Sequence, residues 1–215
     1  MNLSNKRILI TAGPTWVAID TVRVISNIAT GQTGILLAER LLRLGSKITL
    51  LLGPVDNCCL SKKIKLIRFK FFDELRSIIN RELRAKKYDA VIHSAAVADY
   101  KPEKVYRNKI KSAMSSWKLK LISTAKIIDS IKKIKPSLLV VGFKFEPKAG
   151  KNVLIKKARE LMQRANLDFA VANTIDKKYT AYIINNNNQI IGPVFNRNAL
   201  AEKLIMLIGG NLWKD

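Results

Sequence analysis

Small, amide and charged residues gather where predicted strands end, and the first group could bind a phosphate. The stretch Ser26–Gly34 (SNIATGQTG) directly precedes a predicted helix. Small residues let backbone N–H groups approach a ligand, and the positive end of a helix dipole favours an anion. Gly31 and Gly34 lie about twenty residues beyond the first strand, so the pattern is not the G-x-G-x-x-G of dinucleotide-binding proteins, nor is it a Walker A loop. As a bare pattern it is equally compatible with turn and capping chemistry.

A second group follows the strand predicted over residues 89–96. Asp99 there could accept hydrogen bonds from ribose hydroxyls, and Lys109 could carry a positive charge to phosphates or a carboxylate. From their positions alone, the simpler interpretation is that both are surface residues of a loop. His93 has no nucleophile or second histidine at a recognisable spacing, which favours a structural role. Cys58 and Cys59 lack metal-ligand spacing, so we expect plain free thiols and no metal site.

The elements that must position these residues alternate between strand and helix. Strands are predicted over 7–11, 47–52, 64–69, 89–96, 118–122, 138–143 and 168–172, and helices over 31–44, 72–84, 125–134, 153–164 and 198–207. Residues 181–184 and 189–192, joined through Asn185–Asn188, predict an antiparallel hairpin. The sequence therefore predicts one α/β domain over residues 1–215: a doubly wound, mostly parallel, Rossmann-like sheet with a C-terminal antiparallel hairpin. Its ligands should sit at the carboxyl ends of the strands.

The loop after the strand at 89–96 is too long for a compact domain unless it has a function. Residues 97–117 show little hydrophobic periodicity. We expect an active-site lid over about residues 100–117, called the 100–117 loop below.

Composition narrows the class of protein. The chain has 215 residues, 48% of them hydrophobic, and 39 Lys+Arg against 16 Asp+Glu, a formal charge of +23. This apolar content excludes a disordered basic tail. A positive field attracts polyanions and small phosphorylated molecules alike, but the basic residues are scattered and aromatic residues are only 7%, so we expect no specific nucleic-acid binding. We see no signal peptide or membrane span, and the adjacent cysteines suit a reducing compartment; the expected location is the cytoplasm.

Taken together, several stretches are far more specific than any one alone. Their order and spacing resemble the phosphopantothenoylcysteine synthetase family, also called phosphopantothenate–cysteine ligases, over nearly the whole chain. The stretches are Ile10–Thr15 (ITAGPT), Ile19–Asn27 (IDTVRVISN), Gly31–Gly34 (GQTG), Gly53–Pro54, Ser94–Tyr100 (SAAVADY), Lys109–Ser112 (KIKS), Gly142–Glu146 (GFKFE) and Asp168–Asn173 (DFAVAN).

The resemblance implies a ligase of coenzyme A biosynthesis that joins 4'-phosphopantothenate to cysteine. The substrate carboxylate would displace pyrophosphate from a nucleoside triphosphate to give an acyl nucleotide, and the cysteine amine would then displace the nucleotide monophosphate. Bacterial relatives mostly use CTP and eukaryotic ones ATP; we expect CTP, with Mg²⁺ on the triphosphate. A homodimer is expected, and a flavin-binding decarboxylase half would be encoded separately or fused elsewhere.

The resemblance also implies roles for particular residues. Asn27 would serve amide formation by binding the acyl or tetrahedral oxygen, and Lys109 would serve formation of the acyl nucleotide. Arg23, Asn27, Ala29, Thr30 and Gly31 would bind the phosphorylated substrate, partly across a dimer interface. The nucleotide would be bound by His93, Ser94, Ala95, Asp99, Lys109, Ala125, Lys126, Ile127, Ile128, Phe143 and Lys144.

The chain departs from the family pattern at four positions. Ala29 replaces a usual serine and Val17 a frequent glutamate. Leu161 and Ala165 fall where bifunctional bacterial relatives carry two triphosphate-binding lysines, whereas Lys144 and the stretch 155–159 look more like the monofunctional enzymes. Two other functions stay open: an NAD(P)-dependent reductase on the same kind of sheet, which the missing early glycine motif disfavours, and a basic nucleic-acid binder.

Overall fold

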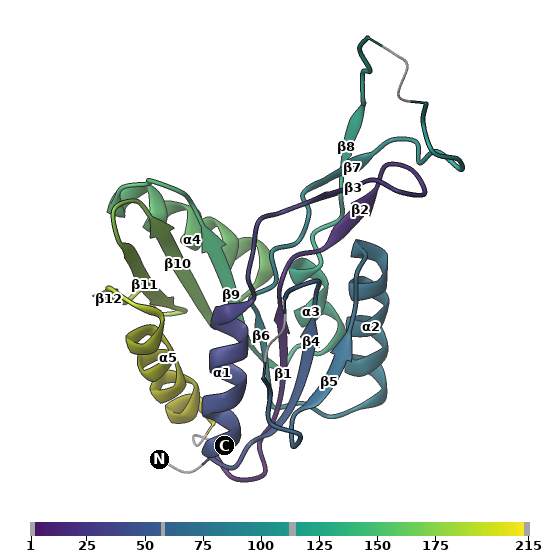
Figure 1. Cartoon of the computed structure of the whole chain (residues 1–215). Helices are drawn as coiled ribbons and strands as arrows, with labels where there is room; N and C mark the ends of the chain where they lie inside the picture. The colour runs from purple at the N-terminus through teal and green to yellow at the C-terminus, as the bar shows by residue number, and fades with distance from the viewer. Residues whose placement is uncertain (1–2, 57–58, 112–114, 213–215) are drawn as a thin grey trace.

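An eight-stranded sheet forms the centre of the computed structural model, which describes residues 3–56, 59–111 and 115–212. The strands stand in the order β12-β11-β10-β9-β6-β1-β4-β5 (Figure 1). Six of them are parallel: β1 (Arg7–Ala12), β4 (Lys47–Leu52), β5 (Lys65–Arg68), β6 (Ala90–His93), β9 (Leu139–Phe145) and β10 (Phe169–Ile175).

The strand order reverses beside β1. The chain builds outward from β1 through β4 to β5, then returns to add β6, β9 and β10 on the other side of β1. Ile8 of β1 pairs with Ile48 of β4 and with Ala90 of β6. In open sheets of this kind the crevice for ligands lies at the carboxyl edge, where the order reverses. The prediction of a doubly wound, mostly parallel sheet is confirmed.

Two apolar layers cover the sheet. On one face α1 (Gln32–Arg43) and α5 (Arg197–Leu212) pack on the sheet. On the other face lie α2 (Phe72–Ala85), α3 (Ile128–Ile134) and α4 (Lys151–Ala165) (Figure 1). β1 and β6 are buried because both layers close over them, which is why they read as continuous apolar runs.

The predicted C-terminal hairpin is confirmed as β11 (Tyr179–Asn185) and β12 (Ile190–Val194), antiparallel to each other, with β11 antiparallel to β10. Asn185 holds the turn, because its side-chain oxygen accepts hydrogen bonds from the N–H groups of Asn187 and Gln189. The final helix is longer than predicted. It continues past Leu207 to Leu212 because Gly209 is buried in the helix instead of ending it.

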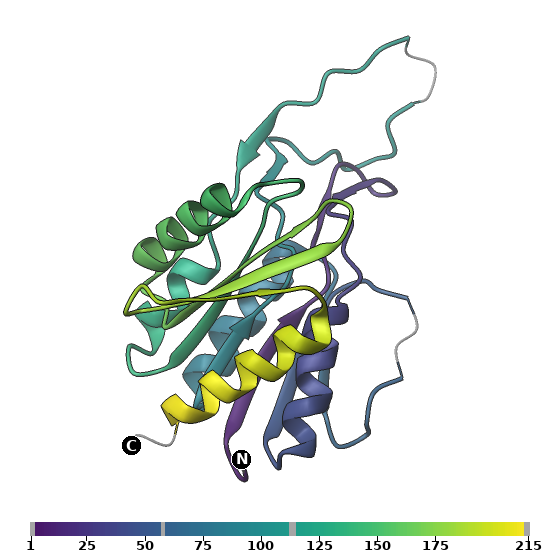
Figure 2. The ribbon, with the colours of Figure 1, turned by 90° about the vertical axis from the view of Figure 1, so that its left-hand side faces the viewer.

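Two small antiparallel sheets stand beyond the carboxyl edge. β2 (Trp16–Ala18) pairs with β3 (Val24–Ser26), and β7 (Tyr100–Pro102) pairs with β8 (Leu121–Ser123). The prediction that the strand near 118–122 joins the parallel sheet is therefore wrong: all three residues of β8 are exposed, so no apolar face draws it into the core. The first small sheet was not predicted. Figure 2 shows the 100–117 loop extending away from the main sheet; its residues 112–114, including Ser112, lie outside the described residues.

Residues 14–30, which carry β2 and β3, begin and end at neighbouring points beside the sheet. Gly13 (φ 79°) follows β1, and Gly31 (φ 70°) precedes α1. A Cβ atom on Gly31 would lie 3.2 Å from the backbone nitrogen of Gly13. Both glycines supply left-handed conformations where side chains do not fit. Residues 14–30 are thus an insertion between β1 and α1 with adjoining ends.

Candidate active site

The loops after β1 and β6 are joined at the point where the strand order reverses. The N–H of Thr15 donates to the carbonyl of Ala96 (3.2 Å), and the N–H of Ala96 donates to the carbonyl of Gly13 (2.9 Å). The hydroxyl of Thr15 accepts the N–H of Ala98 (2.9 Å) and is fully buried. Backbone atoms of both loops therefore form a fixed floor for a ligand.

His93, at the end of β6, is buried in the core beneath these two loops. Thr11 Oγ1 and His93 Nδ1 are 2.9 Å apart, and the hydroxyl of Ser94 donates to the carbonyl of Thr11 (2.7 Å). Burial lowers the pKa of His93 to about 4, so the imidazole is neutral at neutral pH. The side chain of His93 packs in the core, and the N–H groups of Ser94 (3.1 Å) and Ala95 (3.2 Å) donate to the carbonyl and hydroxyl of Thr11, which fixes the backbone after β6.

Asn27 reaches from the β2–β3 insertion to the loop after β6. Its Nδ2 donates to the carbonyl oxygens of Ala96 (3.2 Å) and Val97 (3.1 Å). Because these two bonds use both N–H groups, the side-chain oxygen of Asn27 is the atom left for a ligand. The structure thus places Asn27 at the reversal point, where the sequence predicts the site.

The N-terminus of α1 points to the same edge. Gly31 is its N-cap, and no side chain makes a capping hydrogen bond there. A Cβ atom on Gly34 would lie 2.5 Å from the Cβ of Ala12 and 2.7 Å from Ser94 Oγ, so glycine lets the helix sit directly on the ends of β1 and β6. Ala29 and Thr30 lie partly or fully exposed just before this turn. The arrangement suits an anion.

Asp99 and Lys126 form an ion pair with each other (Oδ1 to Nζ, 2.5 Å), with both side chains well exposed. Thr124 supports the pair by donating from its backbone N–H to the carbonyl of Asp99 (2.9 Å) and from its hydroxyl to the carbonyl of Ala98 (2.6 Å). Ile127 and Ile128 are buried, whereas Ala125 is exposed. The structure brings together the predicted nucleotide-binding segments 94–99 and 125–128.

Phe143 and Lys144 are neighbours on β9 and face opposite sides of the sheet. Phe143 packs with the layer of α1 and α5. Lys144 pairs with Glu146 (3.0 Å), which also pairs with Lys157 of α4 (3.3 Å). The hydrogen bond from Lys144, with the charge of Lys157, holds the pKa of Glu146 below its usual value. Lys144 is thus engaged with its own strand end.

Arg23, which the resemblance assigns to the phosphorylated substrate, makes hydrogen bonds within the chain. Its guanidinium donates to Asp20 Oδ2 (3.0 Å) and to the carbonyl of Ile110 (3.2 Å) in the 100–117 loop. The side chain of Asp20 is fully buried and accepts the N–H groups of Val22, Arg23 and Ile110. Burial disfavours its charge, but these donors outweigh the burial and hold the pKa of Asp20 below its usual value. The sequence reasoning gave Asp20 no role.

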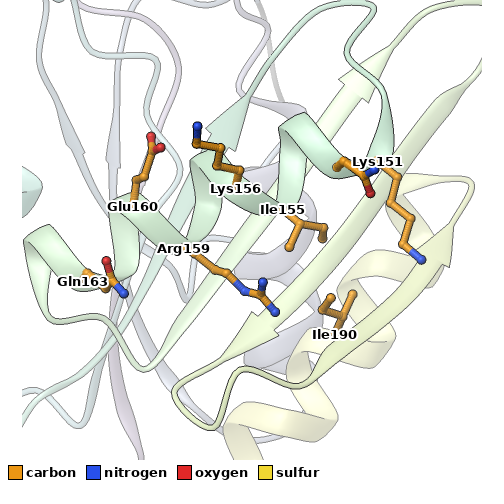
Figure 3. Close-up of a pocket in the computed structure, with 8 residues that line it drawn as sticks. Lys151, Ile155, Lys156, Arg159, Glu160, Gln163 and Ile190 are labelled. Atoms are coloured by element: carbon orange, nitrogen blue, oxygen red, sulfur yellow. The ribbon is translucent and has the colours of Figure 1, made fainter.

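Lys109 is exposed beside this contact. It lines a hollow of about 510 Å³ formed by residues 104–110, which also contribute Lys104 and Arg107. A second hollow, of about 590 Å³, is lined by Lys151, Lys156 and Arg159 of α4 and by Ile190 of β12. Figure 3 shows the side chain of Arg159 pointing towards Ile190 and that of Lys156 pointing away from it.

Two of the departures from the family pattern have a physical reason. Leu161 and Ala165 are buried on the inner face of α4 in the apolar layer. These positions supply packing in this chain, and the cations of α4 lie on its outer face. Cys59 is an exposed free thiol, as expected; Cys58 lies outside the described residues.

Fold and site together define a class: an open, doubly wound α/β protein whose candidate ligand site lies at the carboxyl edge where the strand order reverses. The model of the DNA/pantothenate metabolism flavoprotein C-terminal domain family matches residues 3–206. The chain belongs to this family. The family contains the phosphopantothenoylcysteine synthetase domain that the sequence motifs resemble.

Individual relatives agree. The chain is 37% identical over 174 residues to the "Coenzyme A biosynthesis bifunctional protein CoaBC" of Thermococcus kodakarensis, covering 81% of this chain and 42% of that protein. The chain spans about half the length of the curated relatives it matches. The crystal structure of a DNA/pantothenate metabolism flavoprotein from Streptococcus pneumoniae superposes with a TM-score of 0.86 at 26% identity, covering 96% of this chain and 99% of that one.

A structure of a Cab2 mutant in complex with phosphopantothenate-cysteine shares the fold (TM-score 0.76, 18% identity), covering 98% of this chain and 87% of that one. None of the helices in the described part of the chain has the length and apolarity needed to cross a membrane.

Proposed function

We propose that this chain joins 4'-phosphopantothenate to cysteine through an acyl nucleotide, with CTP as the preferred triphosphate. The observation that carries the proposal is the meeting of Asn27, the α1 N-terminus and the Asp99 segment at the edge of the sheet where the strand order reverses. Family membership and the Cab2 complex with phosphopantothenate-cysteine support the same substrate class.

In the first step a carboxylate oxygen of phosphopantothenate attacks the α-phosphorus of the triphosphate. The bond from that phosphorus to the bridging oxygen breaks, and pyrophosphate leaves. Negative charge from the carboxylate and the phosphates converges here, so a cation that neutralises it lowers the barrier. Lys109, exposed in the basic hollow of the 100–117 loop, is the proposed cation. The α1 N-terminus would hold the substrate phosphate.

In the second step the cysteine amine attacks the acyl carbon, and the bond to the nucleotide breaks. The amine loses a proton, and the nucleotide monophosphate leaves with the former carboxylate oxygen. Asn27 is proposed to orient this step. In the structure its oxygen is available to accept from the amine, and binding of an acyl oxygen by Nδ2 would replace one of the bonds to Ala96 and Val97.

Mg²⁺ is proposed to arrive as part of the nucleotide substrate. The described residues hold no group of three or more His, Cys, Asp or Glu side chains that could bind a metal ion. Mg²⁺ usually keeps several waters and binds through substrate phosphates. A site without a cluster of protein carboxylates is compatible with Mg²⁺ bound in this way.

A homodimer is also proposed. Val22 and Val24 near β2–β3, and Leu121 and Ile122 of β8, are large apolar side chains that are 37–65% exposed beside the site. Apolar side chains gathered on protruding elements favour an interface. Light scattering after size-exclusion chromatography tests this, and a monomer at micromolar concentration contradicts it.

The function is tested by pyrophosphate release with phosphopantothenate, cysteine and Mg²⁺, run in parallel with CTP and with ATP. We expect release that depends on phosphopantothenate and is faster with CTP. Faster release with ATP reverses the nucleotide preference, and no release with either rejects the ligase.

Asn27→Asp separates the two steps. The carboxylate would face the two carbonyl oxygens that Nδ2 now contacts, so we expect the acyl nucleotide to form while phosphopantothenoylcysteine falls by about 10² or more. Asn152→Asp, an exposed position in the first turn of α4, is the matched control and should behave like the parent. Mass spectrometry of the quenched reaction measures both species; normal product from Asn27→Asp removes Asn27 from the mechanism.

A further inference from the structure

The 100–117 loop is bound to the β2–β3 turn at two points that flank Lys109. The N–H of Tyr106 donates to the carbonyl of Ile19 (2.9 Å). At Ile110 the N–H donates to Asp20 Oδ2 (3.2 Å), and the carbonyl accepts from Arg23 Nη2 (3.2 Å). Residues 107–109 therefore form a short arc with both ends held by one turn.

Asp20 is the centre of the second contact. Its side chain has no exposed surface, whereas that of Arg23 is 35% exposed. Oδ1 accepts the N–H groups of Val22 and Arg23 (2.8 Å each), which shapes the turn, and Oδ2 faces Ile110 and the guanidinium. Charge-assisted hydrogen bonds away from water are stronger than neutral ones. One carboxylate thus shapes the turn and binds a segment ninety positions along the chain.

Aromatic contacts hold the other end of the arc. Tyr106 packs edge-to-face on Trp117, with ring centroids 5.8 Å apart, and the Lys104 ammonium lies 5.9 Å from the Tyr106 ring centroid. Fixing the backbone on both sides of Lys109 reduces the volume its side chain can search, since the Cα–Cβ direction of Lys109 is then set.

We propose that Asp20, acting with Arg23, is a positioning residue: it fixes the backbone of Ile110 and thereby holds Lys109 for acyl-nucleotide formation. The catalytic half of this inference rests on the proposed ligase function. The anchoring half rests on geometry alone. Arg23 is by this account a tether of the 100–117 loop, since both of its terminal nitrogens are engaged within the chain.

Trypsin measures the anchor without any substrate, because the Lys109–Ile110 peptide bond lies inside it. Asp20→Asn keeps the shape of the side chain but removes the charge. We expect cleavage after Lys109 to accelerate about tenfold relative to cleavage after the exposed Lys62, which corresponds to about 1.4 kcal/mol of local opening free energy. The matched control is Asp89→Asn, a carboxylate that accepts the N–H of Arg7 (2.6 Å) at the opposite edge of the sheet. It should leave the cleavage ratio unchanged.

Acyl-nucleotide formation measures the positioning. In Asp20→Asn we expect kcat for this step to fall about tenfold or more with the KM for phosphopantothenate within about twofold, as expected when a group is misplaced in the transition state. A loss that is purely structural would instead lower the active fraction, which active-site titration with the pyrophosphate burst reports.

The outcomes are separable. Unchanged cleavage after Lys109 overturns the anchor, and faster cleavage with parent kcat overturns the positioning role. If the parent forms no acyl nucleotide, the proposed function has failed, and the anchor is still decided by cleavage. Should Asp20→Asn fail to fold, Arg23→Lys takes its place: it keeps the charge but loses the planar donor pair that reaches Ile110, and the same acceleration is expected.

Discussion

Two buried carboxylates at opposite edges of the sheet are held in different ways. At the amino edge, Glu82 of α2 accepts from Lys86 Nζ (2.7 and 2.8 Å) and from the hydroxyl of Tyr88 (2.6 Å), and Lys65 lies 3.5 Å away. At the carboxyl edge, Asp20 is held mostly by backbone N–H groups, one of them from the 100–117 loop.

The different partners of the two carboxylates indicate different roles: Glu82 stabilises the fold, and Asp20 positions a loop. All partners of Glu82 are side chains on or next to regular elements, so its contacts reinforce a core that the helices and strands already define. Burial and the hydrogen bond to Glu82 raise the pKa of Tyr88 to about 12, so its hydroxyl keeps its proton and remains a donor at neutral pH. Asp20 instead binds a loop, which is also held by the hydrogen bond from Tyr106 to Ile19 and by the ring contact of Tyr106 with Trp117. Changes at the amino edge should therefore alter stability, and changes at the carboxyl edge should alter activity.

The largest effect should come from Lys109→Ala. Loss of the cation should lower acyl-nucleotide formation by about 10²- to 10³-fold. The unfolding midpoint should not change, because the side chain is exposed. Pyrophosphate release without cysteine gives the first value and thermal unfolding the second. Lys118→Ala, an exposed lysine outside the 100–117 loop, is the control; an equal loss there would mean that general positive charge matters more than position.

His93 sharpens the comparison, because it lies at the carboxyl edge but belongs to the core. Its pKa is about 4 in the fold and 6.5 unperturbed, so the unfolded chain binds the proton first as pH falls. The stability from the neutral imidazole is complete above pH 6.5 and is lost towards pH 4, by up to about 3 kcal/mol. Urea unfolding across this range should show that loss in the parent and a smaller one in His93→Asn. Parallel curves would mean that His93 is accessible to protons in the fold.

The smallest of the three effects is expected at the amino edge. Glu82→Gln leaves the cationic partners without their carboxylate, and we expect a loss of about 2 kcal/mol at pH 7 with kcat unchanged. The pKa of Glu82 lies below its usual 4.5 despite burial, because of its bonds to Lys86 and Tyr88. The carboxylate's contribution is thus complete above pH 4.5 and is lost as pH falls through the lower folded value, so the gap to the variant should narrow in acid. A fall in kcat would break the distinction between the two edges.

The sequence predicts the main sheet well because each long strand carries its own signal. Apolar, β-branched runs such as 7–12 and 90–93 are buried on both faces, and helices such as α1 show an apolar stripe. The three-residue strands carry no such signal. Pairing across loops defines these strands: β2 pairs with β3, and β7 pairs with β8. Every residue of β8 is exposed, so its local hydrophobic pattern does not predict where it lies.

The same limit applies to the site. Strand-end reasoning predicts the edge of the sheet at which the structure places Asn27 and the Asp99 segment, because the carboxyl edge collects loops from many parts of the chain. It misses the partnership of Asp20 with Ile110, since a contact across ninety positions depends on how two loops leave the sheet. It also does not predict the bonds of Arg23 inside the chain, because a guanidinium that binds a carboxylate and a carbonyl looks the same in sequence as one that binds phosphate.

The adjoining ends of the insertion at Gly13 and Gly31 have an evolutionary consequence. Residues 14–30 leave the sheet and return to nearly the same point, so β1 and α1 would keep their places with any connection long enough to turn around. Recognition elements grafted on such a junction can lengthen, shorten or be exchanged while the scaffold keeps its register. The structure thus combines a sheet scaffold with an insertion whose two ends meet, and that insertion bears Asp20, Arg23 and Asn27.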